Sequence, residues 1–332
     1  MRPKKKVALV TGAAGFIGSN FVDFLLKKKY KVFGLDNFST GKKKFLNTAL
    51  KNKNFKFYKI DLLKLKSNSK LFNQDIDIVF HFAANADVRY GFSNPKKDIK
   101  QNIVVTSNIM EAIKYNNIKK IVFTSTGSVY GETKNIPTAE SEDFPIQTSL
   151  YASSKIACEG MISSYCKAFN IQSWIFRFVS VLGERYTHGH VYDFYKKLVY
   201  DKDNLVVLGN GNQRKSYIYV GDCIRAVMKS INFYKKQINI INLGHHEYIS
   251  TRQSIKYISQ YLSVSPKLKF TSKKSSGWHG DNSFIHLDIK KLKKTGWKPK
   301  LSIKDGIIKT LKYINENKWL LNLENKKKLK FL

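Results

Sequence analysis

Cysteine is scarce in this chain of 332 residues. Its three cysteines, Cys158, Cys166 and Cys223, are too few and too scattered for a disulfide framework or a cysteine-rich zinc site, and they fit a reducing cytoplasm. No run of about 18 or more apolar residues occurs, so no membrane span is expected. The apolar residues 7–10 run directly into a glycine motif, which predicts a core strand rather than a signal peptide.

Acidic residues are also in short supply. The chain has 24 aspartates and glutamates against 59 lysines and arginines, which gives a formal net charge of +35. Such a charge is found in proteins that bind nucleic acids or anionic membranes, but here the lysines are spread along the whole chain without a nucleic-acid-binding module. We therefore expect lysine-rich solvated faces, no nucleic-acid partner and an attraction for anionic substrates.

Strand-like and helix-like segments alternate in the first half of the chain. Apolar runs predict strands at residues 6–11, 31–35, 56–60, 76–82, 120–125 and 172–178. Helical spacing is found at residues 16–28, 102–115 and 151–169. This alternation predicts an α/β fold of the Rossmann type, a doubly wound parallel sheet covered by helices, with ligands at the carboxyl ends of the strands.

The second half is less regular. Strands are expected at residues 205–208 and 238–242, and helices at 222–233, 251–262 and 301–317. We assign residues 1–178 to the sheet domain, residues 179–323 to a smaller α/β domain with an interleaved boundary, and residues 324–332 to a basic tail.

Three glycines follow the first predicted strand. They are Gly12, Gly15 and Gly18 in the segment Val10-Thr-Gly-Ala-Ala-Gly-Phe-Ile-Gly-Ser19. Glycine permits a tight turn and close approach of the backbone to a pyrophosphate, and the helix that follows offers free N–H groups and a favourable dipole. The segment predicts a dinucleotide-binding loop, although a plain strand–helix turn would use the same residues.

Asp36 ends the second predicted strand, 18 residues after Gly18. A carboxylate at this place accepts hydrogen bonds from an adenosine ribose and repels a 2′-phosphate, so NAD is expected rather than NADP. The lysines at residues 42–44 are the counterargument. Asp61, at the end of the next strand, is a candidate for contact with the adenine edge, or else a helix N-cap.

Tyr151 and Lys155 lie four residues apart, which places a phenol and an ammonium group on one face of a predicted helix. Lys155 is expected to lower the pKa of the phenol, so that the phenolate becomes a base near neutral pH. The strand before this helix ends in Thr124-Ser-Thr-Gly-Ser128, which can supply a third hydroxyl.

Together these motifs resemble the extended short-chain dehydrogenases/reductases of the nucleotide-sugar epimerase/dehydratase family, closest to the UDP-glucose/UDP-galactose 4-epimerase type. The resemblance runs from about residue 7 to residue 299. It also includes His81-Phe-Ala-Ala84, Asn102, Val129-Tyr-Gly131, Arg177-Phe178, Tyr219-Val220-x-Asp222 and Gly296-Trp-Lys-Pro299. It implies an N-terminal half that binds NAD, a C-terminal part that binds a nucleotide-diphosphate sugar, and a homodimer paired through helices 102–115 and 151–169.

The resemblance implies that Thr126, Tyr151 and Lys155 are catalytic. Tyr151 would take the proton of a sugar hydroxyl, most often the 4-OH, while a hydride passes to NAD and Thr126 hydrogen-bonds the oxygen. In a 4-epimerase the 4-keto sugar turns over and receives the hydride on its other face. The residues expected to contact the cofactor are Gly12, Gly15, Phe16, Ile17, Gly18, Asp36, Asn37, Asp61, Leu62, Ala83, Ala84, Asn102, Ser125, Tyr151 and Lys155.

Other activities use the same groups. A net 4-dehydrogenase would release a 4-keto sugar nucleotide and NADH. A 4,6-dehydratase of this family carries acidic residues directly after the catalytic threonine, whereas this chain has Gly127-Ser128, so dehydration is not expected. A non-catalytic NAD-binding protein would not need the intact set of hydroxyl, phenol and ammonium groups.

The substrate side departs from the family pattern. Ser180 replaces an asparagine that touches the nucleotide diphosphate, and Lys215 replaces a phosphate-binding arginine, with Arg214 beside it. A second family arginine is missing from Gly277-Trp-His-Gly-Asp281, where Trp278 is expected to supply shape or stacking. UDP is the expected nucleotide, with GDP, CDP and dTDP open.

Two further sets of polar residues border this region. Asp87 and Arg89 follow the fourth predicted strand, where they would tune sugar choice or else form a surface ion pair. His188, His190 and Asp193 could suggest a metal, and His245-His246 reads as a loop pair. No metal is expected, since the chemistry needs none.

Overall fold

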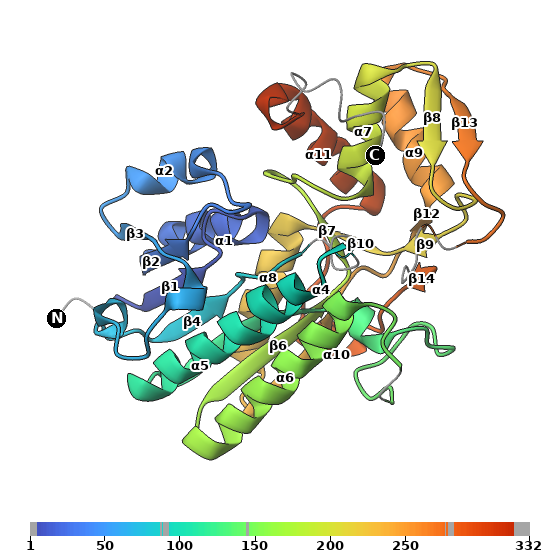
Figure 1. Cartoon of the computed structure of the whole chain (residues 1–332). Coiled ribbons are helices and arrows are strands. Elements are labelled where there is room, and N and C mark those ends of the chain that lie inside the picture. Colours follow the sequence, from blue (N-terminus) through green and yellow to red (C-terminus); the bar gives the residue numbers. More distant parts are fainter. Residues whose placement is uncertain are drawn as a thin grey trace.

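The computed structural model describes residues 5–86, 88, 93–143, 146–275, 277 and 282–321. Its centre is a seven-stranded parallel sheet with the order β11-β6-β5-β4-β1-β2-β3 (Figure 1). The strands are β1 (Val7–Thr11), β2 (Lys31–Asp36), β3 (Phe55–Lys59), β4 (Ile78–His81), β5 (Lys120–Thr126), β6 (Gln172–Phe178) and β11 (Ile238–Leu243). The predicted doubly wound parallel sheet is confirmed.

Helices cover both faces of this sheet, which explains why its central strands read as continuous apolar runs. Alternate residues of β1 enter opposite cores: Ala8 and Val10 pack with α1 (Phe16–Lys27) and α8 (Val220–Phe233), whereas Leu9 packs with α5 (Val105–Tyr115) and α6 (Leu150–Phe169). The carboxyl ends of the strands therefore form the open edge between two helical layers.

The helix expected at residues 102–115 begins earlier and is not uniform. It starts as α4 (Pro95–Asp98), widens into a π-helical segment, η4 (Ile99–Val104), and continues as α5. The wider turn breaks the 3.6-residue period, so the apolar spacing in the sequence fits a regular helix only from Val105 onward. Asp98 and Asn102 are both buried on the inner side of this irregular stretch.

A second, smaller layer is built mostly from the C-terminal part of the chain. Its core is formed by α7 (His190–Tyr200), α9 (Thr251–Leu262), α11 (Ile303–Glu316) and the parallel pair β8 (Asn204–Val207) and β13 (Lys267–Phe270). Two short sheets join the layers: β10 (Tyr217–Tyr219) with β7 (Ser180–Leu182), and β9 (Arg214–Lys215) between β12 (Ile249–Ser250) and β14 (Phe284–Ile285).

The two layers share the chain in an interleaved way. After forming β7 and α7 in the second layer, the chain returns to the main sheet as α8 and β11. The short elements are η1 (Lys43–Leu46), α2 (Asn47–Leu50), η2 (Leu62–Lys64), η3 (Lys70–Phe72), η5 (Gly127–Tyr130), α10 (Lys290–Lys293) and η6 (Lys318–Leu321). None of the described helices is long and apolar enough to cross a membrane. The basic tail, residues 324–332, lies outside the described residues.

Candidate active site

The glycine loop connects β1 to α1 at the carboxyl edge of the sheet. Gly12 has a positive φ of 65°, and a β-carbon on it would lie 2.8 Å from the backbone nitrogen of Ala83. The turn closes when the amide of Gly15 donates to the carbonyl of Gly12 over 3.0 Å. Gly15 is also the N-cap of α1, and no side chain caps this helix. The loop therefore presents a bare helix N-terminus and a cradle without side chains, which fit a pyrophosphate.

Asp36 ties this loop to the end of β2. Its Oδ2 accepts from the amide of Ala14 at 2.9 Å and its Oδ1 accepts from the amide of Phe38 at 2.8 Å. Burial raises the pKa of Asp36, and these backbone hydrogen bonds oppose that rise. A carboxylate oxygen has a second lone pair, so each oxygen can still accept a hydroxyl of a ribose.

Two further candidates for contact with the adenosine of the cofactor, Asn37 and Asp61, lie in the turns that follow β2 and β3. The Oδ1 of Asn37 accepts from the amide of Ser39 at 2.9 Å, which shapes the loop after β2. The Oδ1 of Asp61 accepts from the amide of Leu63 at 3.0 Å and so caps η2, as the alternative interpretation of this residue requires. Leu62 is buried directly behind that cap.

The segment after β4 forms the other wall of the loop. The amide of Ala83 donates to Oγ1 of Thr11 at 3.1 Å. The Oδ1 of Asn102 accepts from the amide of Asn85 at 2.8 Å, and its Nδ2 donates to the hydroxyl of Ser154 at 2.8 Å. Asn102 thus bridges the segment after β4 and helix α6, which carries Tyr151.

Tyr151, Lys155 and Thr126 are brought together at the end of β5. Lys155 lies one turn after Tyr151 on α6, and its Nζ donates to the carbonyl of Thr124 at 2.9 Å. Thr126 hydrogen-bonds Tyr151. The hydroxyl of Ser125 bonds to Glu159 instead. Of the two neighbouring hydroxyls, Thr126 is therefore the one that reaches the phenol.

The electrostatics of this group differ from the sequence-based expectation. The pKa of Tyr151 is raised, because burial of the phenolate and the negative charge of Asp98 outweigh the hydrogen bond from Thr126. Burial also lowers the pKa of Lys155 to about 8, so this amine titrates near neutral pH. The expected net lowering of the phenol pKa by Lys155 is not found, because the desolvation cost of the buried phenolate is larger and cannot be seen in the sequence.

Sequence reasoning missed a buried ion pair beneath these groups. Glu159 lies four residues after Lys155 on α6 and binds Arg177 of β6, with Nη2 and Oε2 2.8 Å apart. In the sequence, Arg177 stands out only as part of the Arg177-Phe178 motif. The one available signal was the four-residue spacing of Glu159 from Lys155, which continues the helix face that carries Tyr151.

The substrate-side candidates are placed less completely. Asp87, Arg89 and Trp278 lie outside the described residues. Ser180 is exposed at the start of β7. Arg214 and Lys215 are consecutive residues of β9, so their side chains leave the strand on opposite faces.

The different surroundings of Arg214 and Lys215 confirm that their side chains lie on opposite faces of β9. The guanidinium of Arg214 lies 4.3 Å from the ring centre of Phe284. Burial, with a smaller contribution from the nearby charge of Lys215, lowers the pKa of His190 to about 3. Both ring nitrogens of His190 are hydrogen-bonded, at 2.7 Å to the hydroxyl of Ser254 and 3.0 Å to that of Tyr217.

The other histidine pair lies in the loop after β11. Ligand atoms of His245, His246 and Glu247 fall within 4.8 Å of one another. Nδ1 of His245 accepts from the amide of Glu247 at 3.0 Å, and Nε2 lies 3.1 Å from the carbonyl of Leu301. With both nitrogens of His245 bonded, we assign no metal here.

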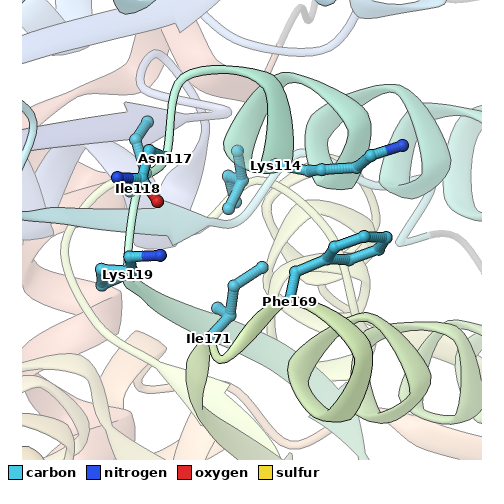
Figure 2. Close-up of a pocket in the computed structure, with 7 residues that line it drawn as sticks. Lys114, Asn117, Ile118, Lys119, Phe169 and Ile171 are labelled. Carbon is cyan, nitrogen blue, oxygen red and sulfur yellow. The ribbon is translucent and has the colours of Figure 1, made fainter.

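One small hollow lies apart from the site (Figure 2). It encloses about 140 Å³ and is lined by Lys119 and Ile171, which precede β5 and β6, together with the ends of α5 and α6. It is therefore at the amino edge of the sheet, opposite the glycine loop and Tyr151.

Comparison with known proteins gives a consistent result. The pattern of the NAD-dependent epimerase/dehydratase family matches residues 8–244. The chain is 32% identical to a putative UDP-glucose 4-epimerase of Methanocaldococcus jannaschii, over 93% of this chain and 98% of that protein. It is 31% identical to the UDP-glucuronate 4-epimerase of Thermodesulfobacterium geofontis, over 93% and 96%.

A solved structure resembles the whole fold. The UDP-glucuronic acid 4-epimerase of Bacillus cereus, in complex with UDP-glucuronic acid and NAD, superposes with a TM-score of 0.83 and 31% identity. The match covers 94% of this chain and 99% of that one. The similarity therefore extends through both layers.

Proposed function

The chain belongs to the NAD-dependent epimerase/dehydratase family, and from this premise we propose that it is an NAD-dependent nucleotide-sugar 4-epimerase. UDP-hexoses are the proposed substrates, since the similar epimerases named above act on UDP-sugars. The observation that carries the proposal is the meeting of Thr126, Tyr151 and Lys155 at the end of β5, beside an uncapped glycine loop.

NAD, when bound, supplies a hydride acceptor that later returns the hydride. The glycine loop and Asp36 would hold its pyrophosphate and adenosine ribose. Tyr151 acts as the general base on the sugar 4-hydroxyl and as the acid when the 4-keto sugar is reduced. Thr126 hydrogen-bonds Tyr151 and orients the reacting oxygen. The ammonium of Lys155, one helical turn away, would stabilise the phenolate that forms during the reaction.

Position 127 supports epimerisation over 4,6-dehydration. A β-carbon at Gly127 would lie 3.3 Å from Ile285, from Leu287 and from the carbonyl oxygen of Phe178. These contacts are tighter than ordinary van der Waals packing, so a side chain at position 127 would require its neighbours to shift. Neither Gly127 nor Ser128 supplies the carboxylate that the dehydratases of this family carry after the catalytic threonine. Water elimination from the sugar therefore lacks its acid–base group.

A net 4-dehydrogenase remains the second candidate, because the same three groups serve it. The two activities differ in their products. We propose to incubate the chain with UDP-, GDP-, CDP- and dTDP-hexoses, to identify the products by NMR and to follow NADH by absorbance. Inverted sugar without net NADH supports the epimerase, whereas a 4-keto product with stoichiometric NADH supports the dehydrogenase.

A homodimer in the cytoplasm, serving carbohydrate biosynthesis, completes the proposal. Exposed apolar side chains lie on the helices expected to pair, including Val104 (38% exposed) beside α5 and Leu150 (42%) at the start of α6. Figure 1 shows these two helices side by side on one face of the sheet. The free, buried thiols of Cys158, Cys166 and Cys223 fit a reducing compartment. A monomer by light scattering at micromolar concentration would contradict the pairing.

A further inference from the structure

Three successive turns of α6 are tied to the last three residues of β5. The helix residues lie at i, i+4 and i+8 and so share one face. The three pairs are Tyr151 with Thr126, Lys155 with the carbonyl of Thr124, and Glu159 with the hydroxyl of Ser125. The first two pairs belong to the proposed chemistry. The third has no role in it so far.

Glu159 is 3% exposed and is held on its other side by Arg177. Nε of Arg177 lies 3.2 Å from both carboxylate oxygens, and Nη2 lies 2.8 Å from Oε2. Arg177 is directly opposite Ser125 in the β5–β6 register, and its guanidinium stacks 4.7 Å above the ring of Tyr130. One carboxylate thus joins α6, β5 and β6 directly behind the reacting groups.

Stability alone does not account for this ion pair. Removing two charges from water costs about as much as their attraction returns, and apolar replacements of buried pairs are often neutral or stabilising. The desolvation cost of the buried pair is therefore explained if the charge of Glu159 has a role in the active site. We propose that Glu159 is a positioning residue of the active site: it fixes the end of β5 against α6 and supplies the counter-charge that keeps Lys155 an ammonium ion.

The surroundings of Lys155 leave few groups to supply that charge. Among the described residues, those that face it are His81 of β4, Asp98 of α4, Phe123 and Thr124 of β5, and Tyr151, Cys158 and Glu159 of α6. Burial lowers the pKa of His81 to about 3 and raises that of Cys158, so both are neutral near pH 7. The anions are therefore Glu159 and Asp98.

The sign of the effect follows from this geometry. Burial lowers the pKa of Lys155 to about 8, and the negative charge of Glu159 acts in the opposite direction. Without that charge, Lys155 would lose its proton at lower pH. At the short distances within one helical turn, we expect a shift of about one pH unit, since Arg177 screens part of the interaction.

The test replaces Glu159 by glutamine, which keeps an acceptor for Ser125 but removes the charge. In Glu159→Gln, the alkaline limb of the turnover–pH profile should move to lower pH by about one unit. The conservative Glu159→Asp variant keeps the charge and should keep the wild-type midpoint, although its shorter side chain should lower kcat. Ser125→Ala removes the hydrogen bond without a charge and should also leave the midpoint in place.

The role of Lys155 in turnover rests on the proposed function, so a second readout avoids the sugar. The dissociation constant of NAD is measured by calorimetry across the same pH range, because Lys155 is among the residues expected to contact NAD and an ammonium donor binds an oxygen acceptor more strongly than a neutral amine does. In Glu159→Gln, the pH at which NAD binding weakens should move to lower pH by the same amount as the alkaline limb of the turnover–pH profile. If the wild type turns over no nucleotide sugar, the proposed function fails while the NAD titration still decides the role of Glu159.

A second variant distinguishes a folding defect from the loss of the Glu159 charge. The double variant Glu159→Gln/Arg177→Gln leaves no unpaired buried charge, and its midpoint should also shift to lower pH, by less than in the single variant because the repulsion from Arg177 is lost too. Loss of stability or turnover with unmoved midpoints in both variants would make the ion pair merely structural and overturn the proposal.

Discussion

Gly18 lies so close to Gly12 that a β-carbon on Gly18 would overlap the carbonyl oxygen of Gly12. The first turn of α1 therefore packs on the loop that precedes it without an intervening side chain. This contact holds the amides at the start of α1 in line with the cradle for a pyrophosphate.

Gly18→Ala should displace this loop and weaken the binding of NAD. Losing one charge-assisted hydrogen bond costs about 1.5–3 kcal/mol, so the dissociation constant should rise by about 10- to 100-fold. Gly160→Ala is the matched control, because Gly160 lies on α6 with open space around its missing β-carbon. It should leave NAD affinity unchanged and add about 0.5–1 kcal/mol of stability. Equal NAD affinity in both variants would remove the glycine contact from cofactor binding.

Tyr151→Phe should nearly abolish turnover and leave NAD bound. The variant keeps the ring but loses the phenol oxygen that exchanges a proton with the sugar, and such groups contribute about 10²–10⁴-fold to rate. The glycine loop and Asp36 are untouched. Single-turnover assays with calorimetry of NAD check both parts, and wild-type turnover in the variant would exclude Tyr151 as the base.

Asp36 should set the choice of cofactor. The wild type should bind NAD more tightly than NADP, because the carboxylate accepts ribose hydroxyls and repels a 2′-phosphate. Asp36→Asn replaces one acceptor by a donor that faces the amide of Ala14 or Phe38. The variant should therefore bind NAD about 10- to 100-fold more weakly, and its preference for NAD over NADP should be smaller. Competitive titration with NAD and NADP measures the ratio of their dissociation constants. Equal affinity of the wild type for both would contradict the assignment.

The sequence places Arg214 and Lys215 at the diphosphate of the nucleotide sugar, and because their side chains leave β9 on opposite faces, we propose Lys215 as the contact and Arg214 as the alternative. Lys215→Ala should weaken substrate binding by about 10- to 100-fold, since one charge-assisted hydrogen bond is lost. Arg214→Ala is the informative comparison, because its side chain leaves β9 on the opposite face and rests on Phe284. Calorimetry with UDP decides, with NAD affinity as the control. An unchanged constant for UDP in Lys215→Ala would leave Arg214 as the sole candidate of the pair.

Features that depend on contiguous residues could be predicted from the sequence. The glycine loop, Asp36 at the end of β2 and the shared face of Tyr151 and Lys155 all follow from local spacing within one strand–turn–helix unit or one helix turn. Their positions in space follow because parallel strands bring their carboxyl ends to one edge.

Features that depend on register between distant segments could not be predicted. The bond between Glu159 and Arg177 joins a helix to a strand, and no periodicity within either element identifies the partner. The π-helical start of the helix before Val105 has no pattern of its own in the sequence, and Asn102 within it bonds to Asn85 and Ser154, which lie in distant segments. The raised pKa of Tyr151 is likewise a product of burial, which spacing does not report.

The edge position of β11 in the sheet affects co-translational folding. β11 pairs with β6 along its whole length, and until residue 243 has left the ribosome β6 is an unprotected edge strand. That edge is apolar on one face, with Trp174 and Phe176 in the core of the finished protein, so it is a template for pairing with another nascent chain. Premature termination after residue 178 should therefore yield aggregates rather than a free cofactor-binding half.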